Sequence, residues 1–173
     1  MKNSYNKTVL VVDDEEDVRN YLKSALVDNG FNVVSASDGI EALEVMKKET
    51  PDLISLDLVM PRHSGMKFYH DLQKNRQWAK IPVLIVTGHA RDDLGKVDFD
   101  TMMMQGPGVY LEKPVKPENY ILKVCQLLTL EPPAGILSTE QDDAENLKQE
   151  LMKNLQQADK EALQKALDAL KMK

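Results

Sequence analysis

Five residues with reactive or charged side chains follow short apolar runs of the sequence. They are Asp13, Asp14, Asp57, Thr87 and Lys113. Three carboxylates that are brought together repel one another, and removing them from water strengthens the repulsion. A hard divalent cation relieves it, and Mg²⁺ suits a site with few protein ligands, all of them oxygen atoms. Beside such a cation an aspartate can attack phosphorus and form an acyl phosphate.

Lys113 and Thr87 complete the groups that phosphoryl transfer needs. The lysine supplies a mobile positive charge and the threonine a hydroxyl donor, and this reaction depends mainly on positioning and charge compensation. Each residue also has an ordinary explanation. Asp57 and Thr87 could be caps or turn residues, Asp13 and Asp14 could start a helix, and Lys113 could be a solvated surface residue. Agreement among all five positions favours the reactive site.

The elements that would position these residues alternate along roughly the first 130 residues. Strands are expected at 8–12, 31–36, 52–56, 81–86 and 108–111, and helical spacing follows each one, with the fourth helix expected between 90 and 104 and the fifth at 118–130. Continuous apolar strands separated by helices predict a parallel sheet covered on both faces. Functional groups gather at the carboxyl ends of such strands, so the five polar residues are expected to meet there.

A boundary follows at 131–137, where two prolines cannot continue a helix. Beyond it, leucines and alanines recur at helical spacing from Leu147 to Leu170. One long helix and a helical hairpin that turns near Ala158 both fit this stripe. No basic face accompanies it and the chain has a net charge of −6, which argues against DNA readout.

Composition restricts the cellular setting. The single cysteine, Cys125, fits a reducing compartment, and the apolar runs are too short to span a bilayer. The first residues do not resemble a signal peptide. A cytoplasmic protein without membrane contact is therefore expected.

Four motifs together resemble the receiver domains of bacterial two-component response regulators. They are Val-Val-Asp13-Asp14-Glu, Leu-Asp57-Leu-Val-Met-Pro61 with Gly65, Thr87-Gly88, and Tyr-Leu-Glu-Lys113-Pro114. The resemblance covers approximately residues 7–130. It implies a flavodoxin-like (βα)5 fold, an α/β doubly wound five-stranded parallel sheet in the order 2-1-3-4-5, followed by a helical tail. The expected division is a receiver domain at 1–130, a linker at 131–137 and a helical extension at 138–173.

The resemblance also implies the roles of the acidic residues. Asp57 would accept a phosphoryl group from a sensor histidine kinase or a phosphotransfer protein. Asp14 would bind Mg²⁺, or Mn²⁺ in its place, directly, and Asp13 mainly through water. Asp57 and the backbone carbonyl of Val59 would complete the protein ligands.

The same resemblance implies a switch. Lys113 would contact the phosphate, Thr87 would move toward it, and Tyr110 would swing inward as the switch aromatic, although a core tyrosine is the alternative. The Lys113-Pro114 peptide would be cis. Val59 and His89, which flank the phosphate, would tune the phosphoryl lifetime.

Two functions remain open at this point. The first is a signalling switch that binds a downstream protein, not a nucleic acid, with a second copy of the chain as a further partner through the tail. The alternative is an aspartyl-phosphate phosphohydrolase. Enzymes of the dehalogenase type have an acid two residues after the nucleophile, where this chain has Val59. That difference favours the switch.

Overall fold

The computed structural model describes residues 5–61, 64–88 and 109–136 of the 173-residue chain. The chain divides into two compact units, Met1–Ile136 and Leu137–Lys173. The second unit lies outside the described residues, so the helical extension and both of its alternatives stay predictions. The helix expected between 90 and 104 and the flanking residue His89 also lie outside them.

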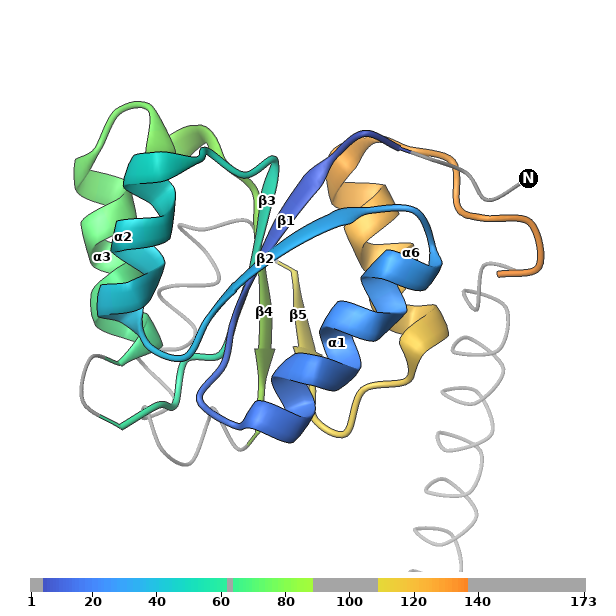
Figure 1. The fold of residues 1–173 in the computed structure, drawn as a ribbon, viewed down its shortest axis with the longest axis horizontal. Helices are drawn as coiled ribbons and strands as arrows, with labels where there is room; N and C mark the ends of the chain where they lie inside the picture. The colour runs from blue at the N-terminus through green and yellow to red at the C-terminus, as the bar shows by residue number, and fades with distance from the viewer. Residues whose placement is uncertain (1–4, 62–63, 89–108, 137–173) are drawn as a thin grey trace, which may run out of the picture. The chain divides into compact units, whose positions relative to one another are not determined.

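Five parallel strands form one sheet in the order β2-β1-β3-β4-β5, which confirms the predicted fold class (Figure 1). The strands are β1 (Thr8–Val12), β2 (Asn32–Ala36), β3 (Leu53–Leu56), β4 (Val83–Thr87) and β5 (Tyr110–Glu112). The described helices are α1 (Glu16–Asp28), α2 (Gly39–Lys48), α3 (Gly65–Lys74), the 3₁₀ turn η1 (Trp78–Lys80) and α6 (Pro117–Leu128).

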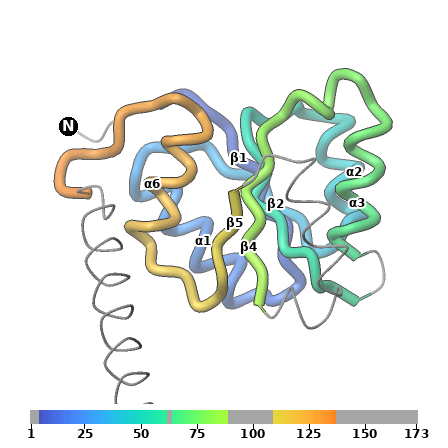
Figure 2. Tube along the Cα trace, turned by 180° about the vertical axis from the view of Figure 1, so that it is seen from behind, coloured from blue at the N-terminus to red at the C-terminus, as the bar shows by residue number. Residues whose placement is uncertain are grey.

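Two helical layers cover the sheet, and the alternation of side chains along the strands explains why. Leu10 and Val12 of β1 face a core that α2 and α3 complete, whereas Val9 and Val11 face a core completed by α1 and α6. Figure 1 and the reverse view in Figure 2 show these helix pairs on opposite sides of the sheet. Strands that bury both faces need the continuous apolar composition seen in the sequence.

The start of β4 differs from the sequence expectation. Ile81 was expected in the strand, but its amide donates to the carbonyl of Trp78 at 3.0 Å and closes the 3₁₀ turn η1. The strand therefore begins at Val83, after Pro82. An apolar run alone does not separate a strand from a buried turn that leads into it.

Strand pairing brings the polar residues together. Val12 of β1 lies opposite Leu56 of β3, so the following residues, Asp13 and Asp57, leave the sheet side by side. In the same way, Thr87 of β4 pairs with Glu112 of β5, and the next residue on β5 is Lys113. The parallel register thus places residues from distant parts of the chain at one edge.

Candidate functional site

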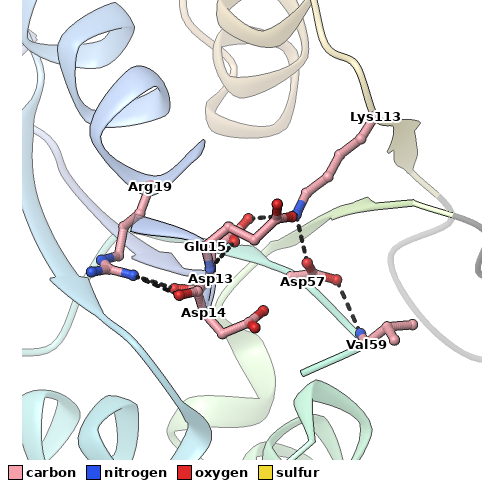
Figure 3. Close-up of polar contacts among 7 residues, drawn as sticks. All are labelled: Asp13, Asp14, Glu15, Arg19, Asp57, Val59 and Lys113. Atoms are coloured by element: carbon pink, nitrogen blue, oxygen red, sulfur yellow. Dashed lines mark hydrogen bonds and ion pairs between the residues drawn. The ribbon is translucent and has the colours of Figure 1, made fainter. Parts of the chain in front are cut away.

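Three carboxylates converge at the carboxyl ends of β1 and β3 (Figure 3). Asp13, Asp14 and Asp57 each offer one oxygen atom, and these atoms all lie within 4.8 Å of one another. Asp13 is only 1% exposed and Asp57 only 4%, while Asp14 is partly exposed. Solvent therefore reaches the cluster at Asp14, whereas the side chains of Asp13 and Asp57 are buried.

Lys113 reaches into this cluster from the end of β5 (Figure 3). Its Nζ lies 2.6 Å from Oδ2 of Asp57 and 2.9 Å from Oδ2 of Asp13. A third carboxylate oxygen, Oε1 of Glu15, lies 3.1 Å away. Burial alone would lower the pKa of Lys113, but hydrogen bonds and charge from Asp57 and Asp13 outweigh it and raise this pKa above its usual value. The lysine is thus firmly protonated.

At Asp13, by contrast, the effect of burial on the pKa outweighs that of Lys113. Burial raises the pKa of its carboxyl group, Lys113 lowers it by hydrogen bonding and charge, and the nearby charge of Asp57 raises it again. The net shift is upward from the ordinary value. At Asp13, Lys113 therefore does not fully offset the effect of burial on the pKa.

Backbone groups orient the two buried carboxylates. The amide of Glu15 donates to Oδ1 of Asp13 and the amide of Val59 donates to Oδ1 of Asp57, both at 3.0 Å. In each aspartate the second oxygen, Oδ2, is left facing Lys113. These two hydrogen bonds fix which carboxylate oxygen of each aspartate faces the centre of the site.

Arg19 of α1 holds the loop that carries the acid pair. Its guanidinium donates to the backbone carbonyl of Asp13 at 2.7 Å and to that of Asp14 at 3.4 Å (Figure 3). Because the arginine binds carbonyl oxygens, it leaves the carboxylates of both residues available for other ligands.

Gly65, the first residue of α3, allows this helix to approach the site closely. A Cβ atom at this position would collide with the backbone carbonyl oxygen of Asp57 and lie 2.7 Å from Cα of Leu58. Only glycine lets the helix start directly against the loop that carries Asp57.

The remaining expected residues lie around this centre. Thr87 is buried, and within the described part of the chain its hydroxyl oxygen has no hydrogen-bond partner. Tyr110 is 40% exposed, so the alternative of a core tyrosine is wrong. The Lys113-Pro114 peptide bond is cis. The Val59 side chain is exposed.

Sequence reasoning missed three contributions. Glu15 as a partner of Lys113, Arg19 as an anchor of the acid loop, and the close approach at Gly65 all depend on distances between elements. For Glu15 and Arg19 the signal in the sequence was position, because Glu15 follows the acid pair directly and Arg19 lies one helical turn further on. Gly65 was part of the quoted motif, but the motif did not give the reason for a glycine there.

Comparisons with known proteins show the family of this chain. The chain belongs to the response regulator receiver domain family, whose sequence profile matches residues 9–125. It is 35% identical to the alkaline phosphatase synthesis transcriptional regulatory protein PhoP of Bacillus subtilis, over 71% of this chain and 49% of that protein. It is 32% identical to the hybrid signal transduction histidine kinase D of Dictyostelium discoideum, over 89% of this chain and 10% of that protein.

A solved structure shows the same fold. The receiver domain of the Francisella response regulator 1452 is 29% identical, with a TM-score of 0.61, over 72% of this chain and 98% of that one. The chain thus spans about half the length of the Bacillus subtilis relative and a tenth of the length of the Dictyostelium discoideum relative. No helix in the described part of the chain has the length and hydrophobicity that a bilayer crossing requires.

Proposed function

We propose that this chain is a receiver whose Asp57 accepts a phosphoryl group from a histidine kinase or a phosphotransfer protein. The observation that carries the proposal is the meeting of Asp57, two further carboxylates and Lys113 at one sheet edge. The protein acts as a signalling phosphoacceptor that promotes its own phosphorylation and dephosphorylation, and not as an enzyme that turns over foreign substrates.

We further propose that the acid cluster holds Mg²⁺, which Mn²⁺ can replace. The donor set fits, because three carboxylates offer hard oxygen atoms within 4.8 Å of one another. The raised pKa of Asp13, caused mainly by burial, is consistent with a carboxylate that a bound cation would help to keep ionised. Asp13, Asp14, Asp57 and the carbonyl of Val59 would hold the ion. When bound, it supplies positive charge that attracts the oxygen atoms of a phosphoryl group.

The residues of the chain then divide the work of transfer. A carboxylate oxygen of Asp57 forms the new bond to phosphorus, while the bond from phosphorus to the donor histidine breaks and its electron pair stays on the ring nitrogen. Lys113 stays protonated and balances charge on the phosphoryl oxygens. The buried hydroxyl of Thr87, which has no hydrogen-bond partner in the described structure, is ready to donate to one of them.

The signal leaves through a change in the surface beside β5. Tyr110 lies next to Ile85 of β4 in the sheet, two residues before Thr87. A movement of Thr87 toward the phosphoryl group opens space into which the partly exposed Tyr110 ring can turn. The altered surface then binds a downstream protein, and neither a nucleic acid nor a membrane.

Phosphorylation of the whole chain by acetyl phosphate and Mg²⁺ tests this proposal. Intact-protein mass spectrometry is expected to show one added phosphoryl group on the wild-type chain. Asp57→Asn should abolish the adduct, because the amide is a poor nucleophile. Asp71→Asn is the matched control, since Asp71 lies on α3 and pairs with Lys74 away from the site. Labelling of the Asp57→Asn chain at the wild-type level would exclude Asp57 as the acceptor.

A further inference from the structure

The third partner of Lys113 differs from the other two. Asp13 and Asp57 are buried, whereas the side chain of Glu15 is 60% exposed. Glu15 also makes the longest of the three contacts, 3.1 Å, compared with 2.9 Å and 2.6 Å for the aspartates. Its own backbone amide meanwhile fixes the carboxylate of Asp13. Glu15 thus contacts the site through both its backbone and its side chain.

We propose that Glu15 is a positioning residue that retains Lys113 before phosphorylation and selects against highly anionic phosphodonors. This inference rests on the proposed phosphorylation of Asp57. It concerns a residue outside the acid cluster that would bind the metal ion.

The hydrogen-bonding capacity of Lys113 supports retention. A lysine ammonium group has three N–H donors, and three carboxylate oxygens surround this one. A phosphoryl oxygen can gain a donor from Lys113 only if one of these contacts is released. The contact to Glu15 is the easiest to release, because it is the longest and the carboxylate can be solvated by water.

The position of Glu15 supports selection. A cavity of about 590 Å³ lies between α1 and the segment after β5 and is lined by both Glu15 and Lys113, together with Gly88, Tyr21 and Val115. Glu15 is the most exposed of the three partners of Lys113, so a phosphoryl group that approaches Lys113 from solvent also approaches the Glu15 carboxylate, which lies 3.1 Å from Nζ. Repulsion between like charges then penalises a donor in proportion to its negative charge.

Two small phosphodonors of different charge distinguish the two proposed effects of Glu15, which are retention of Lys113 and repulsion of anionic donors. Acetyl phosphate transfers its phosphoryl group when the bond from phosphorus to the acyl oxygen breaks, and acetate leaves with the electron pair. Phosphoramidate transfers it when the P–N bond breaks, and ammonia leaves. Acetyl phosphate is the more negatively charged donor at neutral pH, because the nitrogen of phosphoramidate is protonated. Both donors form the same bond to a carboxylate oxygen of Asp57.

The experiment measures phosphorylation rates of the full chain with saturating Mg²⁺ for Glu15→Gln, Glu15→Ala and Glu15→Asp. Glu16→Gln is the matched control, because Glu16 is the exposed neighbouring residue and carries the same charge. Glu15→Gln and Glu15→Ala should react about two- to fivefold faster with acetyl phosphate, the range expected for loss of an exposed ion pair. The gain should be smaller with phosphoramidate and should shrink at high salt.

The controls decide between the possible outcomes. Glu15→Asp should stay near the wild-type rate, and Glu16→Gln should match the wild type with both donors. Equal rates for Glu15→Gln and Glu16→Gln, or a slower Glu15→Gln chain, would overturn the role of Glu15 while leaving Asp57 phosphorylation intact. A wild-type chain that takes up no phosphoryl group from either donor would instead overturn the proposed function, and this inference with it.

Discussion

Asp13 and Asp57 are charged groups in a part of the molecule that excludes most water, and Lys113 is the cation that contacts both. Burial opposes the charge on each of the three groups. The fold tolerates this arrangement because the ammonium and the backbone amides supply hydrogen bonds to the carboxylates. The raised pKa of Asp13 shows that the compensation is incomplete. Buried carboxyl groups with shifted pKa values are typical of functional sites.

Asp13→Asn should stabilise the protein at neutral pH when no divalent ion is present. The pKa of Asp13 is raised above 3.8 in the folded state, so the folded protein binds this proton more tightly than the unfolded chain does. The free energy of unfolding therefore falls as pH rises from 3.8 through the raised pKa. Asparagine removes this loss, and we expect a gain on the order of 1 kcal/mol in urea unfolding.

Asp52→Asn provides a control of opposite sign. Burial raises the pKa of Asp52, but Lys7 and the amide of Thr8 more than offset it, and the net pKa lies below 3.8. Its ionised form therefore contributes stability above pH 3.8, which is lost as pH falls through the lowered pKa. Asp52→Asn should be less stable than the wild type at neutral pH. A destabilised Asp13→Asn chain at that pH would show that Asp13 is fully compensated.

The elements around the site fulfil separate tasks. Strands β1 and β3 bring the carboxylates together, β5 delivers Lys113, and α1 anchors the acid loop through Arg19. Helix α3 begins where its first residue, Gly65, lies against the backbone of Asp57 and Leu58. The Ser64 hydroxyl caps this helix by accepting from the amide of Lys67. The start of α3 is therefore tied directly to the position of Asp57.

Gly65→Ala should destabilise the protein by about 1–3 kcal/mol, the usual cost of overpacking. The added methyl group would meet the carbonyl oxygen of Asp57 and must displace backbone rather than a flexible side chain. Gly88→Ala is the control, because a Cβ atom there would meet none of the described residues within 4 Å. Urea unfolding of both variants measures the difference. Equal stabilities would mean that α3 can shift away from the acceptor loop without cost.

The sequence was informative for features that depend on local pattern. Apolar runs ending in polar residues predicted the strands and which side chains would gather, because a parallel sheet aligns its carboxyl ends. It could not locate the start of β4, since Ile81 is as apolar as a strand residue but closes a 3₁₀ turn. Nor could it reveal that Glu15 and Arg19 reach the site, because their contacts depend on how α1 docks.

At the scale of the molecule, two cores on opposite faces of the sheet support the site. The segment after α6 belongs to one of them: Ile136 packs against the core of α1 and α6. Tyr5 binds the carbonyl of Glu131 through its hydroxyl at 2.8 Å and stacks on Phe31 with ring centroids 4.6 Å apart. Tyr5 and Glu131, which lie near the two ends of the first unit, are thus in contact.

A chain that ends at Ile136 should fold and accept phosphate at the rate of the full chain. The reason is that every proposed site residue and both cores lie within the first unit. Circular dichroism and mass spectrometry after incubation with acetyl phosphate measure the two properties. A truncated chain that folds but takes up no phosphoryl group would show that the segment from 137 to 173 contributes to the site.

The most direct test of the central claim is to map the phosphorylated residue. The full chain is incubated with acetyl phosphate in Mg²⁺ or in EDTA, then reduced with borohydride, which converts an aspartyl phosphate to homoserine. Peptide mass spectrometry should find homoserine in place of Asp57 in the Mg²⁺ sample and none in the EDTA sample. Reduction at another carboxylate, or equal labelling in EDTA, would contradict the account.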